Sequence, residues 1–423
     1  MFFRGLYHVI FMYLFTAFSL LMGQDEMMYK DIALPYIHDE SIRLDMPEDS
    51  SRFVALFGKI NRIKHGSSEQ LHIIHIGGSH VQAGAMTDRL RRHFSGLLPE
   101  ELIGDRGFVF PYTIAGYNNP SDYKVDYTGQ WKGCRSAYRK HDCHWGLAGL
   151  SAITTDPVAS ITVKPAHHIY GSHLFDRCRL YFQDSEAAYH VEVLNWECPV
   201  QVTLDSLHGF IEWQFDNDQR SVEILIRKLD ITDTVQTFSV MGLQFLKDSP
   251  GITVHGIGVN GAKVSSFLRC DDLSRQLCLI EPDLIIFGIG LNDVYMPNGR
   301  FKPESFREDY EALLQRIDEC PQKPALIFLT NNDHYYRKRF ANKNNYKSNM
   351  VFYDLARAHD GAIFDLFNIM GGLQSMKKWR NDDLAKSDLI HFKSKGYHII
   401  ADMIFDAFER QYINFALPEK HSK

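Results

Sequence analysis

The apolar residues of the chain recur with two different periods, and the change from one to the other divides the sequence. Over residues 53–63 they follow a helical spacing, which predicts a first helix. The next apolar run, residues 71–76, is short and rich in isoleucine. It ends at two glycines, and an amphipathic helix is predicted after them over 83–98. Strand, glycine turn and helix in this order are the opening unit of a doubly wound α/β fold.

A long interval with a different pattern follows. Between residues 108 and 246 the chain is rich in aromatic residues, and many apolar positions alternate with polar ones, as in strands with one buried face. Strands are predicted over 160–163, 178–182, 190–194, 211–215, 222–226 and 237–246. This pattern predicts an inserted all-β domain of the sandwich or jelly-roll type.

The alternation of strands and helices then resumes. Strands are predicted over 252–256, 284–288, 325–329 and 362–365, and helices over 263–279, 304–317, 350–358 and 395–410. We therefore expect one α/β domain in two parts, residues 24–107 and 247–423, with the β insert, residues 108–246, between them. Residues 24–50 are polar and irregular, and they are interpreted as a lead-in to this domain.

The first 23 residues have the order of a secretory signal peptide. Arg4 precedes an apolar run from Leu6 to Met22, and Gly23 stands before the polar residues 24–26. A membrane-spanning helix is the competing interpretation, because about 17 apolar residues are near the lower limit for crossing a bilayer. No basic stop-transfer cluster follows the run. We expect cleavage after Gly23 and an exported protein, periplasmic or secreted, with no integral membrane segment after signal removal.

Composition and charge exclude several classes of protein. Hydrophobic residues make up 45% and charged residues 23% of the 423 positions, as in an ordinary globular chain. The 46 Lys and Arg against 52 Asp and Glu give a net charge of −6, so we expect no nucleic-acid partner. No C-x-x-C or H-E-x-x-H spacing occurs, and neither a metal site nor a cofactor is expected. The oligomeric state is left open.

The seven cysteines are an odd number. In an exported chain at least one of them must stay free or pair with another molecule. Cys134 and Cys143 are a candidate pair, which the sequence alone does not decide.

Four short segments carry the candidate chemistry, and each lies where a strand gives way to a loop: residues 77–80, 258–261, 290–293 and 388–391. Open α/β sheets have their binding sites at the carboxyl ends of the strands. Ser79 stands between a glycine turn and a helix, where its hydroxyl can project and its N–H can join the helix N-terminal donors. A helix N-cap serine is the alternative interpretation.

The other three segments supply what a nucleophilic serine needs. An imidazole accepts a serine proton when a carboxylate holds its tautomer, and Asp388 and His391 are close enough in sequence for that. Gly261 and Asn292 offer a backbone N–H and a side-chain amide for an oxyanion. Each residue also has a simpler interpretation when taken alone. Asp388 could be a surface carboxylate and His391 a helix cap, and Gly261 and Asn292 could be turn residues.

A dinucleotide site is a rival interpretation of one segment. Residues 256–261 read G-x-G-x-x-G after a predicted strand. That fingerprint requires an acidic residue at the end of the next strand, and Glu281 instead precedes the strand over 284–288. The same segment lacks the adjacent Gly-Lys and the Ser or Thr of a phosphate-binding loop.

Together the four segments resemble the SGNH (GDSL) hydrolase superfamily, whose blocks are matched in order by Ser79, Gly261, Asn292 and His391. The Ser79-His80 pair and the β insert between the first two blocks are similar to the peptidoglycan O-acetylesterase branch. The resemblance implies a flavodoxin-like three-layer SGNH sandwich with a parallel central sheet. It also implies that the insert is a jelly-roll-like domain of the carbohydrate-module kind.

The resemblance further implies an exported serine esterase that removes acyl groups, O-acetyl first of all, from a cell-wall or polysaccharide glycan. Ser79 is then the nucleophile, His391 its base and Asp388 the orienting carboxylate. The oxyanion hole would consist of the N–H groups of Ser79 and Gly261 and the amide of Asn292. An inactive glycan-binding protein and an O-acyltransferase on the same scaffold are the alternative functions.

Two positions depart from the family pattern. Gly78 stands where the family has an aspartate before the serine, and Leu291 stands before the asparagine, where threonine or a small residue is usual. The family aspartate chiefly organises the turn, so Gly78 bears on efficiency more than on chemistry. In the insert, Tyr117, Trp131 and Trp145 are candidate sugar contacts along one wall of the cleft, although core packing is the favoured role for any single one of them.

Overall fold

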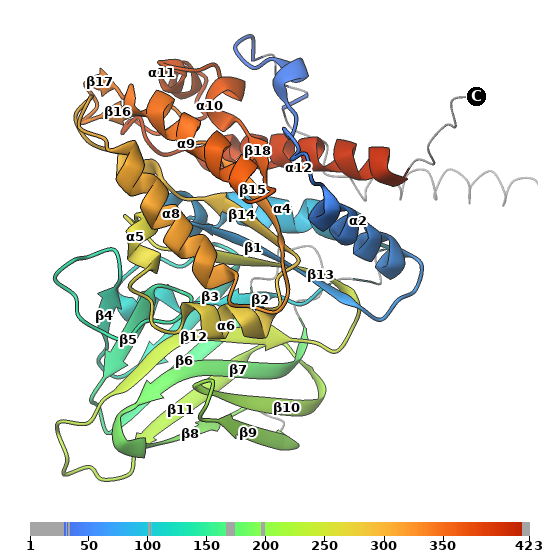
Figure 1. Ribbon diagram of the computed structural model, residues 1–423. Coiled ribbons are helices and arrows are strands. Elements are labelled where there is room, and N and C mark those ends of the chain that lie inside the picture. Colours follow the sequence, from blue (N-terminus) through green and yellow to red (C-terminus); the bar gives the residue numbers. More distant parts are fainter. Residues whose placement is uncertain are drawn as a thin grey trace, which may run out of the picture.

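The α/β part of the molecule is built on a five-stranded parallel sheet in the order β13-β1-β14-β15-β18 (Figure 1). The computed structural model describes residues 29–416 except 31, 33, 100, 101, 103, 166–173 and 196–198. The strands are β1 (Gln70–Gly77), β13 (Gly251–Gly258), β14 (Leu284–Gly288), β15 (Ala325–Leu329) and β18 (Ala362–Phe364). The first strand of the chain lies between the second and the third of this sheet, which is the flavodoxin-like order. The predicted fold class is confirmed.

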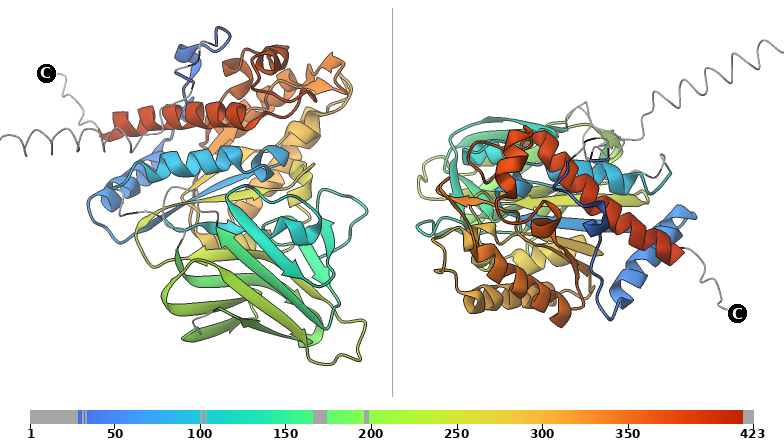
Figure 2. Two further views of the ribbon diagram at one scale, coloured as in Figure 1. Left: turned by 180° about the vertical axis from the view of Figure 1, so that it is seen from behind. Right: turned by 90° about the horizontal axis from the view of Figure 1, so that it is seen from above.

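Helices cover both faces of this sheet (Figure 2). Consecutive side chains of a strand point to opposite faces, so Ile73 of β1 packs with one group of helices and Ile74 with the other. The group with Ile73 comprises α2 (Ser51–Lys64), α4 (Ala85–Ser95) and α12 (Ser394–Ala416). The group with Ile74 comprises α6 (Leu273–Ile280), α8 (Pro303–Ile317) and α9 (Asn344–Ala358). The result is a three-layer sandwich.

Short elements complete the α/β part. They are α3 (Ser79–Gln82), α5 (Val264–Phe267), α7 (Leu291–Val294), α10 (Leu366–Ile369), α11 (Ser375–Asn381), the 3-10 turn η1 (Asp39–Ser41) and the hairpin of β16 (Tyr335–Tyr336) and β17 (Phe340–Ala341). In the part of the chain that the structure describes, none of the helices has both the length and the apolar character that a membrane span requires.

Two expectations for the α/β part are wrong. The helix predicted over 263–279 is divided into α5 and α6, because the N–H of Asp272 donates to the carbonyl of Trp145 in the insert (3.2 Å). The described residues between 29 and 50 are more than a lead-in, since Ile42 is buried and Asp45 exchanges two 2.9 Å backbone hydrogen bonds with Ile363 of β18. The predicted signal peptide, residues 1–23, lies outside the described residues.

Residues 107–246 form two antiparallel sheets and, within the described ranges, contribute no strand to the parallel sheet. The first sheet has the order β4-β5-β12-β7-β10-β9, with β2 also paired to β12. Its strands are β2 (Gly107–Val109), β4 (Lys132–Arg135), β5 (Leu150–Thr154), β7 (Phe175–Asp184), β9 (Gln201–Asp205), β10 (Phe210–Gln219) and β12 (Phe238–Leu246). The second has the order β3-β6-β11-β8, with β3 (Tyr123–Thr128), β6 (Val158–Pro165), β11 (Val222–Lys228) and β8 (Tyr189–Val193). Two 3-10 turns, η2 (Tyr112–Ala115) and η3 (Ser185–Ala187), lie in the same region.

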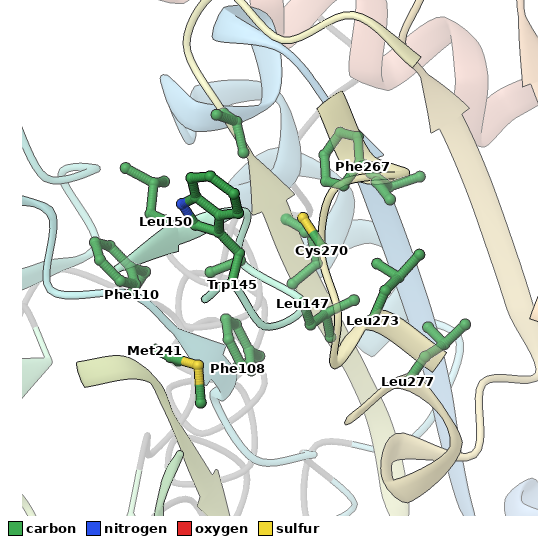
Figure 3. Close-up of a cluster of buried hydrophobic side chains, with 14 of the residues drawn as sticks. Phe108, Phe110, Trp145, Leu147, Leu150, Met241, Phe267, Cys270, Leu273 and Leu277 are labelled. Carbon is green, nitrogen blue, oxygen red and sulfur yellow. The ribbon is translucent and has the colours of Figure 1, made fainter. Parts of the chain in front are cut away.

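The insert and the α/β part share one hydrophobic core (Figure 3). Phe108 and Trp145 of the insert face Phe267 and Leu277, which follow β13. Trp145 is 3% exposed and its indole N–H donates to the carbonyl of Cys134 (3.2 Å). Trp145 is therefore a core residue, the role favoured for it from the sequence, and not a sugar contact, because its ring fills the space between the two parts.

Two disulfides are present among the described residues. One joins Cys134 to Cys143 within the insert, and the other joins Cys278 at the end of α6 to Cys320 after α8. Cys178 and Cys270 are free and buried, and burial raises the pKa of the Cys270 thiol to about 12. Cys198 lies outside the described residues.

Candidate active site

Three glycines at the carboxyl ends of neighbouring strands lie side by side and form the base of the site, called here the glycine floor. Gly77 of β1 is in register with Gly258 of β13 on one side and with Gly288 of β14 on the other. A Cβ on Gly77 would lie 2.5 Å from the Val81 side chain and 2.6 Å from the Gly288 carbonyl, so no larger residue fits there. The loops that leave these three strands therefore start within contact of one another.

Ser79 begins helix α3 directly after this floor. Its N–H is a first-turn helix donor and finds no intrahelical acceptor, because the helix begins at this residue. Gln82, at the other end of α3, accepts a hydrogen bond from the N–H of Asn260 through its Oε1 (2.6 Å). This bond fixes the serine helix to the loop that follows β13.

Ser79, His391 and Asp388 form a continuous chain of hydrogen bonds. The Oγ of Ser79 lies 2.8 Å from Nε2 of His391, and Nδ1 of His391 lies 2.8 Å from Oδ2 of Asp388. The other carboxylate oxygen of Asp388 accepts the N–H groups of Ile390 and His391, each at 2.9 Å. Nδ1 of His391 donates to the carboxylate, which leaves Nε2 as the acceptor that faces the serine hydroxyl.

The electrostatics keep the acid of this chain ionised. Burial opposes the charge on Asp388, but the hydrogen bonds from the backbone and ring of His391 and from the Ile390 N–H hold the pKa of that carboxyl below its usual value. A second imidazole, His80, lies with its ring centre 5.2 Å from that of His391 and has Nδ1 2.8 Å from the hydroxyl of Tyr397. Burial lowers the pKa of His80 to about 3, so His80 stays neutral beside the triad.

The three predicted oxyanion donors come from the three loops above the glycine floor. The amide nitrogen of Asn292, on α7, donates one hydrogen to the carbonyl of Ala262 (2.9 Å), which leaves its second N–H for another acceptor. Gly261 lies three residues before the first residue of α5, Val264, and has φ +80° and open space on its side-chain face. A Cβ on Gly78 would lie only 3.3 Å from the Asn292 amide nitrogen. Because Gly78 has no side chain, the amide group of Asn292 is not crowded from this side.

A buried cluster of polar residues after β15 joins the loop of Asn292 to the loop of His391. Asn332 donates to the carbonyl of Ile390 (3.2 Å), and the N–H of Tyr335 donates to the carbonyl of Leu389 (3.0 Å). Asn342 donates to the carbonyl of Val294 at the end of α7 (2.7 Å).

Our sequence analysis missed this cluster. The signal was present in Thr330-Asn331-Asn332-Asp333-His334 at the end of a predicted strand, because a run of polar residues at that position of an α/β sheet marks a site edge.

The two remaining candidate sugar contacts, Tyr117 and Trp131, are both half-buried in the insert. Tyr117 is half-buried beneath the guanidinium of Arg135, 5.2 Å from its ring centre, and Trp131 is half-buried with its indole N–H on the carbonyl of Thr128 (2.9 Å). Both keep an exposed part and remain candidate sugar contacts. Within the described residues, no group of three or more His, Cys, Asp or Glu is arranged to hold a metal ion.

Comparisons with known proteins bear on the family and the fold. Residues 234–399 match the GDSL-like lipase/acylhydrolase family, a range that includes Gly261, Asn292, Asp388 and His391 but not Ser79. No curated protein matches the chain. A solved peptidoglycan O-acetylesterase is similar over 85% of this chain and 96% of its own, with a TM-score of 0.66 and 20% identity. The resemblance to SGNH/GDSL hydrolases is confirmed, and the fold is shared with that esterase, insert included.

Two further structures are similar over a smaller part of the chain. An acetyl xylan esterase covers 38% of this chain and 83% of its own, at 19% identity and a TM-score of 0.30. An acetylxylan esterase from Geobacillus stearothermophilus covers 37% and 73%, at 18% identity and a TM-score of 0.31.

Proposed function

We propose that this chain, which is similar to the GDSL-like lipase/acylhydrolase family, is an exported esterase that removes O-acetyl groups from a glycan. The observation that carries the proposal is the hydrogen-bonded chain Ser79–His391–Asp388, with both bonds at 2.8 Å. The family match supports ester hydrolysis in general. We propose three further points beyond ester hydrolysis: the acyl group is acetyl, it is carried by a glycan, and the protein is exported.

The first half of the reaction forms an acyl-enzyme. The Oγ of Ser79 attacks the acyl carbonyl carbon while its proton passes to Nε2 of His391, and Asp388 stabilises the imidazolium that results. The carbonyl oxygen becomes an oxyanion, which accepts hydrogen bonds from the N–H groups of Ser79 and Gly261 and from the second N–H of Asn292. When the tetrahedral intermediate collapses, the sugar oxygen leaves and takes the proton from His391.

The second half returns the enzyme to its starting state. A water molecule attacks the acyl carbon and gives one proton to Nε2 of His391. The same donors hold the new oxyanion, the bond to Oγ breaks, and the proton returns to Ser79 as the carboxylic acid leaves. One ester and one water thus become one alcohol and one acid. His391 therefore accepts a proton and gives it back once in each half.

A glycan substrate is supported by two features. The β insert packs against the side of the α/β part on which α5 and α6 lie, and its residue Arg135 reaches the carbonyl of Asn260 beside Gly261 (3.4 Å). The solved structure that shares the whole fold is by its name a peptidoglycan O-acetylesterase. The order of residues 1–23 supports export.

The test is acid release from a small chromogenic ester and from acetylated glycans. Ser79→Ala and His391→Ala should each lower kcat by about 10⁴-fold or more, and the double variant little further, because the triad acts as a unit. Asn292→Ala should cost roughly 10²–10³-fold, as one oxyanion donor among three. Asn381→Ala, an exposed change on α11, serves as the control and should keep full activity.

Three results would contradict the proposal. Equal rates from wild type and Ser79→Ala remove Ser79 from the mechanism. Glycan binding without acid release from any ester identifies an inactive binding protein. Transfer of the acetyl group to an added sugar in preference to water identifies an acyltransferase.

A further inference from the structure

Two segments of this acidic chain carry Lys and Arg as their only Asp, Glu, Lys or Arg residues, and both border the candidate active site. Residues 127–141 contain four Lys or Arg and no Asp or Glu, and residues 335–350 contain five Lys or Arg and no Asp or Glu. The whole chain has a net charge of −6, so the charge of these two segments is opposite in sign to that of the chain. The first belongs to the insert around β4, and the second contains the β16–β17 hairpin and the start of α9.

Direct contacts attach each basic segment to a loop of the site. The guanidinium of Arg135 donates to the carbonyl of Asn260, the residue before Gly261 (3.4 Å). The N–H of Arg337, at the hairpin tip, donates to the hydroxyl of Tyr295, which directly follows the helix of Asn292 (3.1 Å). Figures 1 and 2 show β4, α5 and the hairpin along one side of the molecule, with α5 between the other two.

The loop of the catalytic histidine adds a third cation. Lys386 lies two residues before Asp388, and its N–H donates to the carbonyl of His391 (2.8 Å). Its side chain is exposed. Arg135, Arg337 and Lys386, from here on the basic rim, therefore come from three separate segments, each hydrogen-bonded to a loop of the site.

No member of the basic rim forms an ion pair with the described residues. Arg135 lies over the ring of Tyr117 and Arg337 over that of Tyr336, with guanidinium carbons 5.2 Å and 5.3 Å from the ring centres. Such contacts orient a guanidinium without neutralising it. The three charges are thus left to be balanced by solvent or substrate.

Two carboxylates of the site, Asp388 and Asp293, are held by other partners. Asp388 is bonded to His391 through one oxygen and to two backbone N–H groups through the other. Asp293 is buried on α7, where its carboxylate accepts the N–H of Val264, and burial raises its pKa to about 7. Lys263, which lies close enough to Asp293 and Asp309 to favour their charged forms, is left out of the rim for that reason.

We propose that the basic rim selects a glycan that bears carboxylate groups beside its acyl esters, such as a uronic-acid polymer or peptide-bearing cell-wall chains. A neutral acylated glycan has no anionic group for the half-buried Arg135 or for the exposed Arg337 and Lys386, whereas carboxylates beside the ester are attracted to all three cations. Attraction between exposed charges is screened by salt, so the selection is salt-dependent. This inference rests on the proposed function for its reaction, but the binding step is separate from the chemistry.

The experiment measures binding and turnover separately. Ser79→Ala protein is titrated calorimetrically with three ligands of equal length: acetylated peptidoglycan fragments, acetylated uronic-acid oligomers and acetylated xylo-oligosaccharides. We expect the two anionic ligands to bind about tenfold more tightly than the neutral one in 20 mM salt, and the difference to shrink at 0.5 M salt. The triple change Arg135→Gln, Arg337→Gln and Lys386→Gln should abolish the preference in both binding and KM.

A matched control removes the same charge elsewhere. Lys64→Gln, Lys323→Gln and Arg220→Gln change exposed residues at the opposite edge of the sheet and on the turn between β10 and β11. This variant should keep the preference. Equal affinity for all three ligands, or a preference that survives loss of the rim, overturns the inference. Preference for only one of the anionic ligands identifies which carboxylate source fits. Loss of ester hydrolysis with the binding preference intact would instead count against the proposed function.

Discussion

At the scale of single residues, the closest packing around Ser79 depends on Gly258, the last residue of β13. A Cβ at this position would lie 2.2 Å from the N and 2.6 Å from the Cα of Gln82, at the end of the serine helix. Backbone atoms cannot move aside as the end of a flexible side chain can. The glycine therefore lets α3 sit directly on the strand end, and the position of Ser79 depends on it.

Gly258→Ala should thus displace α3 and damage both stability and activity. We expect a loss of about 2–3 kcal/mol in the free energy of unfolding, as for other overpacked sites, and a kcat at least 10²-fold lower. Urea unfolding and turnover of a small ester measure the two effects.

Gly58→Ala is the matched control for this change. Gly58 lies inside α2, where the added methyl group meets only the end of the Arg62 side chain at 3.5 Å. It should raise stability by about 0.5–1 kcal/mol, because alanine is the better helix former. If both variants behave alike, the close approach of α3 to β13 has no consequence for the site.

At the scale of elements, the loops of Asn292 and His391 are joined by the buried asparagines that follow β15. Asn332 donates one amide hydrogen to the carbonyl of Ile390, which adjoins His391, and the other to the carbonyl of Asp333 (2.8 Å). Asn345 donates to the carbonyl of Asn332 (3.0 Å). The orientation of the His391 loop is thus set from another strand of the sheet.

Asn332→Ala should loosen that loop without removing any group that touches the substrate. A buried carbonyl that loses its donor costs about 1–3 kcal/mol. We expect kcat to fall about tenfold while KM stays within twofold, and the thermal midpoint to fall by a few degrees. Kinetics of the exposed variant Asn381→Ala provide the comparison; a KM effect as large as the kcat effect would assign Asn332 to substrate binding.

At the scale of the whole molecule, the insert and the α/β part are held together by a shared core. Trp145 lies within it, and the guanidinium of Arg269 covers its ring at 4.7 Å. Trp145→Ala should lower the free energy of unfolding by about 3–5 kcal/mol, as for other buried aromatic residues. Trp131→Ala, at a half-buried position of the same insert, should cost less than half as much. Unfolding in two separate transitions in wild type would contradict a shared core.

Buried histidines make the whole fold sensitive to acid. Burial lowers the pKa of His72 and of His334 to about 4, and of His75 to about 3. In the unfolded chain each imidazole has a pKa of about 6.5. Between about pH 6.5 and 4 the unfolded chain therefore binds protons that the native protein does not, and stability must fall as the pH falls.

Urea unfolding at pH 7 and at pH 4.5 measures this loss. Wild type should lose several kcal/mol over the interval, at about 1.4 kcal/mol for each pH unit and each buried histidine. His75→Gln should reduce the slope, and the exposed His38→Gln should leave it unchanged. The same slope in all three proteins would exclude His75 as a source of the acid sensitivity.

The sequence by itself determined the parallel sheet, the β character of the insert and the four segments of the site. These depend on local information: apolar period, glycine turns and the order of short motifs along the chain. The strands of the insert that were not predicted, among them β3, β4 and β9, are short or largely exposed, so their apolar pattern is weak. Ser79, Gly261 and Asn292 could be grouped from sequence because parallel strands end at a common edge.

Only the tertiary structure decided how distant parts meet. An aromatic residue such as Trp145 could either stack on a sugar or pack in a core. Trp145 is a core residue because side chains of the α/β part, such as Phe267 and Leu277, pack in the same cluster. The helix over 263–279 is broken by a hydrogen bond from a segment more than 120 residues away in sequence, between Trp145 and Asp272. The 2.8 Å contact between Ser79 and His391 spans 312 positions. Local propensity contains no information on such distances, which result from the packing of the whole chain.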